Sequence, residues 1–159
     1  MDRLPEALIL NIFKKLPPKD LYQVQMVCSQ WRRIAFSPIL WKVIDANAEV
    51  PTKVLKQLIQ NAHLLEELIL QDRKDVDEIL RLVAEYPSNL KALKLFNCWG
   101  TNDCQNIAHS GLLKLVKMCP MLRIFHFDQC LEEMSFDFLR ILTRREGASI
   151  QFREVRVIF

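Results

Sequence analysis

Cysteine and histidine are the residue types of this chain whose spacing could support catalysis or metal binding. The five cysteines are Cys28, Cys98, Cys104, Cys119 and Cys130. Their number is odd, no C-x-x-C pair occurs, and no histidine follows at zinc-finger spacing, so we expect neither a disulfide scaffold nor a metal site. Cys104 and Cys119 are the candidate nucleophiles. His109 or His126 would have to act as the base, but no third group is suggested that would orient it, so we expect a non-catalytic protein without a cofactor.

Composition and charge indicate a globular protein with a basic N-terminal part. Half of the 159 residues are apolar, which is enough to bury a core. Residues 1–45 carry seven Lys and Arg against four Asp and Glu, whereas residues 46–159 carry fifteen of each. This excess of basic residues could attract an acidic partner surface and steer its approach. Nucleic-acid binding would need a much larger excess of basic residues. No apolar run approaches the ~18 residues of a membrane span, and the N-terminus does not resemble a signal peptide, so we expect a cytoplasmic or nuclear protein.

Three short helices are predicted within residues 1–45. An apolar stripe at helical spacing runs over residues 4–16, with Pro5 in the first turn, where a missing N–H costs little. The two prolines that follow end this helix, and Asp20 is a suitable N-cap for the second. Ser29 could cap a third helix that carries Trp31. Helices this short cannot bury all of their apolar surface against one another.

The segment with this pattern is LPEALILNIFKKLPPKDLYQVQMVCSQWRRIAFSPILWKVID, and it resembles an F-box over its whole length. The resemblance implies docking on a Skp-type adaptor, which joins a cullin scaffold and a RING subunit that recruits the ubiquitin-charged enzyme. The side chains that would carry the docking are Leu4, Pro5, Ile9, Ile12, Phe13, Leu16, Pro17, Leu21, Val27 and Trp31. Large apolar anchors contribute about 1.5–3 kcal/mol each when fully buried. Any one of them could instead belong to the core of the module, because core and interface anchors look alike in a sequence.

A repeat of the form L-x-x-L-x-L runs through the rest of the chain. Its copies are Trp41, Ile44, Ala46; Leu65, Leu68, Leu70; Leu90, Leu93, Leu95; Leu122, Phe125, Phe127; and Phe152, Val155, Val157. Apolar patterns with helical spacing lie between these copies, over residues 54–62, 76–83, 112–119 and 134–142. Each repeat is therefore predicted to be a strand, a loop and a helix.

The fold class predicted from these elements is α/β. A three-helix F-box at 1–45 precedes a short right-handed leucine-rich-repeat solenoid of about four units at 46–159, with parallel strands on the concave face and helices on the convex face. Cys98 and Cys130 extend two copies of the template, which resembles the cysteine-containing repeats that often follow F-boxes and implies a buried structural thiol. The sequence ends directly after the last predicted strand. We therefore expect its exposed end to be covered by a partner or a second copy, or the sequence to be truncated.

Strand alternation predicts which side chains line the concave face. The candidates for contact with a target are Ile69, Lys94, Phe96, Trp99, His126 and Arg156. A basic strip of Lys94, His126 and Arg156 could recognise an acidic or phosphorylated peptide. The same residues could also be ordinary solvated positions of the repeats.

Together, these patterns favour a non-catalytic substrate receptor of a Skp, cullin and F-box ubiquitin ligase. Such a receptor holds the ligase at one end and a protein target at the other, which raises their effective concentration. An alternative is a decoy, regulator or scaffold that occupies the adaptor without a substrate of its own. Neither hypothesis needs a nucleic acid or a membrane as partner. The exposed residues of a repeat scaffold vary, so the pattern does not name the target.

Overall fold

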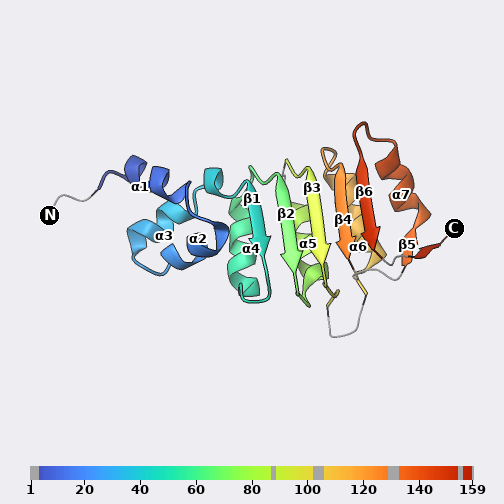
Figure 1. Ribbon diagram of the computed structural model, residues 1–159, viewed down its shortest axis with the longest axis horizontal. Helices are drawn as coiled ribbons and strands as arrows, with labels where there is room; N and C mark the ends of the chain where they lie inside the picture. The colour runs from blue at the N-terminus through green and yellow to red at the C-terminus, as the bar shows by residue number, and fades with distance from the viewer. Residues whose placement is uncertain (1–3, 87–88, 102–105, 129–132, 154–155, 159) are drawn as a thin grey trace.

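The computed structural model describes residues 4–86, 89–101, 106–128, 133–153 and 156–158. Three helices and a 3-10 turn form one end of the molecule, and a parallel sheet backed by helices forms the rest (Figure 1). This arrangement confirms the predicted α/β class, with a helical module before an array of strand and helix repeats.

The helical module consists of α1 (Glu6–Phe13), α2 (Pro18–Val24), α3 (Ser29–Ala35) and the 3-10 turn η1 (Pro38–Leu40). The helix caps in the structure differ in detail from the predicted ones. α2 already begins at Pro18, because proline is favoured in the first turn, so Asp20 lies inside the helix. Cys28 rather than Ser29 caps α3, since its sulfur accepts a hydrogen bond from the Trp31 N–H at 3.4 Å.

The array begins with β1 (Val43–Ala46), which spans the predicted boundary at residue 45. The elements that follow are α4 (Thr52–Asn61), β2 (Glu67–Gln71), α5 (Val76–Glu85), β3 (Ala92–Phe96), α6 (His109–Met118), β4 (Ile124–Asp128), β5 (Glu133–Ser135), α7 (Phe136–Thr143), β6 (Ser149–Arg153) and β7 (Arg156–Ile158). The main sheet has the order β1-β2-β3-β4-β6, and every neighbouring pair is parallel. Parallel neighbours need crossovers, which α4, α5, α6 and α7 provide.

The repeat template places one face of the sheet in the core. Leu68, Leu93 and Phe125 occupy equivalent positions on three adjacent strands and are fully buried. Ile44 pairs with Leu68, so the weak first copy of the template is a true strand. Residues between the template positions are only partly buried and face away from the helices, as the two-residue period of a strand requires. We call this second surface the open face.

The fifth copy of the template was assigned wrongly. The template predicts that Val155 and Val157 occupy the last two buried positions of this strand. In the structure, β6 pairs with β4 and places Ile150 opposite Phe125 and Phe152 opposite Phe127. Arg156 lies in β7, which pairs with β5 in a separate two-stranded sheet. The apolar residues from 150 to 158 alternate with polar ones and fit the template in two registers, so the sequence pattern alone does not select the strand.

Cys98 occupies the structural role implied for a repeat cysteine. It is fully buried just after β3, and its Sγ lies 3.3 and 3.2 Å from the carbonyl oxygens of Leu70 and Phe96, which share its single S–H donor. The thiol thereby satisfies strand-end carbonyls of two neighbouring repeats. Cys104 and Cys130 lie outside the described residues.

Trp41 joins the helical module to the array. Its side chain is 1% exposed, and its indole Nε1–H donates to the Ala35 carbonyl oxygen at 2.5 Å. The ring of Tyr22 in α2 lies 5.2 Å from it, measured between ring centroids. One continuous apolar core therefore extends from Ile9 in α1 to Leu142 in α7.

A buried arginine fastens the first repeat to the second. Arg73, which follows β2, is 4% exposed and forms a two-point ion pair with Asp75 at 2.9 and 2.6 Å. It also donates to the carbonyl oxygens of Asn47 and Val50 at 2.7 and 2.8 Å. The guanidinium thus satisfies carbonyls of the loop between β1 and α4.

We expect Arg73→Met to lower the free energy of unfolding by about 3–5 kcal/mol, because it leaves the Asp75 carboxylate without its cationic partner and two carbonyls without their donor. Urea denaturation measures this change. The exposed Arg81 in α5 supplies the matched control, and Arg81→Met should change stability by less than about 0.5 kcal/mol. Equal effects of the two substitutions would contradict a role for Arg73 as a brace.

The same ion pair predicts an acid-sensitive contribution to stability. Burial raises the pKa of Asp75, but hydrogen bonds from Arg73 and Thr52 outweigh it and hold the pKa below its ordinary value. A carboxyl whose folded pKa is depressed stabilises the fold above its unfolded pKa of about 3.9. This contribution should be lost as pH falls through the folded pKa. Urea unfolding from pH 6 to pH 3 should therefore show a steeper loss for the wild type than for Asp75→Asn, and parallel curves would contradict the assignment.

Candidate protein-interaction surfaces

Three of the residues expected to contact an adaptor belong instead to the core. Ile9 and Phe13 are buried on the inner side of α1, and Leu21 is buried on α2. A side chain enclosed by its own chain cannot lie against a partner's surface, so their assignment as direct contacts is corrected. They hold the helices in position, and their substitution would act through the fold.

Two further candidates are partly enclosed. Trp31 meets Phe13 edge to face at 5.3 Å between ring centroids, and Leu16 packs against the same core. Pro5 and Pro17 are exposed and immediately precede α1 and α2. The backbone that enters each helix is thus held extended by a proline, which has no N–H to satisfy.

The outer side of α1 carries an exposed apolar stripe. Leu4, Leu8 and Ile12 are 54%, 49% and 51% exposed, and they follow one another at intervals of four residues. That interval places Leu8 and Ile12 on one side of α1, away from Ile9 and Phe13, and Leu4 lies just before the helix. Val27 is exposed in the turn between α2 and α3. Leu8 is absent from the predicted contact set, although its helical spacing from Ile12 indicates the same side of α1.

Basic side chains accompany this apolar stripe. Lys14 and Lys15 are exposed at the end of α1. Arg33 on α3 forms an exposed ion pair with Glu6 on α1, and Arg32 donates to the Gln25 carbonyl oxygen at 3.1 Å. Exposed charges of this kind contribute little to stability, but they influence the rate at which a charged partner associates.

The open face of the sheet brings together four of the expected target-contact residues. Lys94 on β3 pairs laterally with Ile69 on β2 and with His126 on β4. The His126 ring lies against Phe96 in an edge-to-face contact at 5.0 Å. Lys94 forms an ion pair with Glu67 at 2.5 Å, so its charge is largely balanced within the repeat.

The other two residues of the expected target set lie elsewhere. Trp99 is in the loop after β3, where its backbone N–H donates to the Arg73 carbonyl oxygen at 2.8 Å. Arg156 belongs to β7, and Gln151 takes the position opposite His126. The lateral row of side chains on the open face therefore ends at the neutral Gln151 on β6 and not at a basic residue.

Of the two candidate nucleophiles, Cys104 lies outside the described residues, so the structure describes only Cys119. Cys119 is 2% exposed at the end of α6, so a substrate cannot reach its sulfur. Among the residues that the structure describes, no cluster of histidine, cysteine and carboxylate side chains has the arrangement of a metal site. Within the same residues, no helix is long and apolar enough to cross a membrane.

Comparison with known proteins agrees with the helical module and the repeats. Residues 1–47 match the model of the F-box-like family. The chain is 26% and 27% identical to "Putative F-box/LRR-repeat protein 23" and "Putative F-box/LRR-repeat protein 22" of Arabidopsis thaliana, with 80% and 84% of the chain covered. It is 24% identical to "F-box/LRR-repeat protein 12" of Homo sapiens over 80% of the chain.

The matched regions account for 29%, 45% and 39% of the lengths of these three relatives, so the chain spans less than half of each. The match to the family model ends one residue after β1. The relatives, by contrast, match across most of the repeat array as well. The chain thus carries an F-box-like domain at residues 1–47, followed by strand and helix repeats, and is related to the F-box/LRR-repeat proteins.

Proposed function

We propose that this chain is the substrate-receptor subunit of a Skp, cullin and F-box ubiquitin ligase. Its F-box-like domain docks on a Skp-type adaptor, and its repeat array holds a protein target. The observation that carries the docking is the apolar stripe of Leu4, Leu8 and Ile12. Leu8 and Ile12 lie on the outer side of a helix that already buries its other side, and Leu4 adds a third exposed aliphatic side chain just before it, so that a partner would cover a contiguous apolar surface.

The division of α1 into two apolar sides supports this assignment. Ile9 and Phe13 fix the helix to the module, and the opposite stripe is left for a second surface. Lys14 and Lys15 next to the stripe would favour an acidic adaptor surface and accelerate its approach. Docking of this kind requires no chemistry from the chain itself. The ligase acts by proximity, in the cytoplasm or the nucleus.

The rigid joint between the two parts supports the receptor role. Trp41 is packed by both the helical module and the array, so a target on the repeats stays at a fixed position relative to the adaptor. A fixed geometry keeps the effective concentration of the target at the ligase high. On the open face, the Phe96 and His126 pair offers an aromatic contact surface for the target. Because Glu67 balances the charge of Lys94, the open face favours an acidic or phosphorylated target less than an unbalanced basic strip would.

Removal of the exposed stripe should abolish adaptor binding while the fold persists. The double variant Leu8→Ala and Ile12→Ala should bind a purified Skp-type adaptor at least a hundredfold more weakly, since the two side chains together contribute about 3 kcal/mol or more. Calorimetric titration measures the affinity. Thermal unfolding should change little, because both side chains are already exposed.

A matched control is available on the array. Met118 on α6 and Ile124 on β4 are exposed to a similar degree, at 58% and 42%. The double variant Met118→Ala and Ile124→Ala should bind the adaptor as the wild type does. If the wild-type chain binds no Skp-type adaptor, or if both double variants lose affinity equally, the proposed docking is wrong.

The open face should be needed for the target and not for the adaptor. In cells that lack the chain, quantitative proteomics should reveal a protein that accumulates, and its level should fall when wild-type chain is restored. The double variant Phe96→Ala and His126→Ala should fail to restore that level while it still binds the adaptor. If no protein accumulates, a decoy or scaffold that occupies the adaptor is favoured over a receptor.

A further inference from the structure

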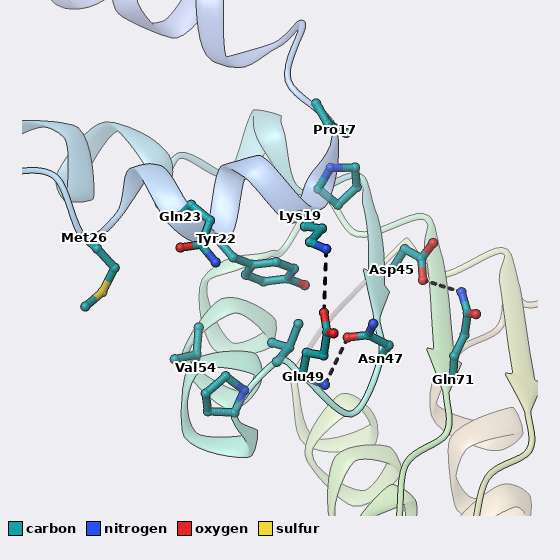
Figure 2. A pocket seen from close by; sticks show the side chains of 13 residues that line it. Pro17, Lys19, Tyr22, Gln23, Met26, Asp45, Asn47, Glu49, Val54 and Gln71 are labelled. Carbon is teal, nitrogen blue, oxygen red and sulfur yellow. Dashed lines mark hydrogen bonds and ion pairs between the residues drawn. The ribbon is translucent and has the colours of Figure 1, made fainter.

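A pocket of about 570 Å³ lies where the helical module meets the first repeat. One wall comes from the start of α2 and the turn after it, and the other from the end of β1 and the loop that leads to α4 (Figure 2). Pro18, Met26 and Val54 give apolar walls, while Asp45 and Glu49 add carboxylates. The volume is in the range of pockets that hold a small molecule or a side chain with its flanking backbone.

The pocket contains a polar group that the chain leaves unsatisfied. The hydroxyl oxygen of Tyr22 is sealed from water, and no hydrogen-bond partner for it occurs among the described residues. Figure 2 shows the Tyr22 side chain directed toward the side of the pocket that carries Asp45 and Glu49. Burial, with the Asp45 carboxylate as second cause, raises the pKa of Tyr22 well above its ordinary value, so the hydroxyl stays protonated. A buried hydroxyl without a partner costs about 1–3 kcal/mol.

The carboxylates in the pocket have capacity to accept more hydrogen bonds. One oxygen of Asp45 accepts from Gln71 Nε2 at 2.8 Å, and its other oxygen has no partner within the described part of the chain. Asn47 adds a side-chain carbonyl oxygen nearby, which accepts the Glu49 N–H at 3.1 Å. Asp45, Asn47 and Glu49 therefore offer acceptors in the pocket, and Lys19 is the one cationic side chain among the described residues that line it.

A weak ion pair occupies the acidic side of the pocket in this state. The Lys19 ammonium lies 3.8 Å from the Glu49 carboxylate, and both side chains are more than 70% exposed. Lys19 and Tyr22 are three residues apart on α2 and so lie on the same side of the helix. An exposed pair of this kind contributes at most about 1 kcal/mol, so a better donor displaces Lys19 at little cost.

From this arrangement we propose that the pocket binds an arginine side chain of a peptide segment. A guanidinium has five N–H donors in one plane, which suits acceptors on several sides of a pocket better than a compact ammonium does. Its donors reach the Asp45 and Glu49 carboxylates. Once the side chains that cover it in the free chain move aside, the hydroxyl oxygen of Tyr22 also accepts from the guanidinium and thereby gains a partner. The aliphatic part of the side chain packs against Val54 and the prolines.

As a contact for a target, this site deepens the proposed function and rests on it. The binding step itself requires neither adaptor nor ubiquitin. An assay with the chain alone therefore separates the two proposals, since loss of adaptor docking leaves peptide binding intact, and absence of peptide binding leaves docking intact.

The test is fluorescence polarisation of the full chain with a labelled Ala-Gly-Arg-Gly-Ala peptide. The matched probe carries citrulline, which keeps the shape of arginine and lacks its charge. We expect the citrulline peptide to bind at least tenfold more weakly, and binding should weaken with added salt. Equal binding of the two peptides, or no binding of the arginine peptide, would overturn the proposal.

Substitutions locate the site. Asp45→Asn preserves an acceptor for Gln71 but removes the charge, and should weaken binding of the arginine peptide at least tenfold. Asp72→Asn is the matched control, because Asp72 is an exposed carboxylate that accepts from Asn97 Nδ2 outside the pocket. It should leave binding unchanged. Equal effects of the two variants would show that the peptide responds to overall charge and would overturn the site.

Tyr22→Phe separates binding from folding. If the hydroxyl serves a ligand, its removal should leave the melting temperature unchanged or higher, because no hydrogen bond is lost in the free chain. The same variant should weaken binding of the arginine peptide severalfold. Unchanged binding in a variant that is at least as stable as the wild type would exclude Tyr22 from the site.

Discussion

The packing of Trp41 between the helical module and the first repeat is the interaction on which the rest of this structure depends. Repeat strands bury their apolar faces against neighbouring repeats, so the first repeat must be covered by something else. Here the helical module performs that function. Trp41 is almost completely enclosed, its indole N–H is bonded to the Ala35 carbonyl oxygen, and α2 lies against β1. The F-box-like domain is therefore also the N-terminal cap of the array, and the two parts share one continuous core.

That shared core explains how a helix as short as α1 can present apolar residues on two sides. Ile9 and Phe13 face inward and fix the helix, so the outer stripe does not have to contribute to folding. Leu4, Leu8 and Ile12 therefore stay exposed. Without a fixed inner side, an exposed stripe of this size would collapse into the module.

The joint also creates the pocket, since its two walls belong to different parts of the chain. Arg73 is bonded to the carbonyl oxygens of Asn47 and Val50, and so it holds the loop that supplies Glu49. Asp45 is held by strand β1, and the fixed loop backbone holds the position of Glu49 beside it. The unsatisfied hydroxyl of Tyr22 is a local cost to stability within this firm frame, which is common where a surface is organised for binding.

The sequence by itself determined the order of elements, the parallel array and the buried face of the sheet. The spacing of Leu68, Leu70, Leu93 and Leu95 was sufficient, because a two-residue period leaves only one face to bury. It misplaced the last strand, because the apolar residues near Phe152 alternate in two registers, and only pairing with β4 selected Ile150. Tertiary structure alone decided which side of α1 is exposed, since that depends on what packs against Phe13. The pocket was equally beyond the sequence, because Tyr22 and Asp45 are brought together by the packing of α2 on β1 and share no local pattern.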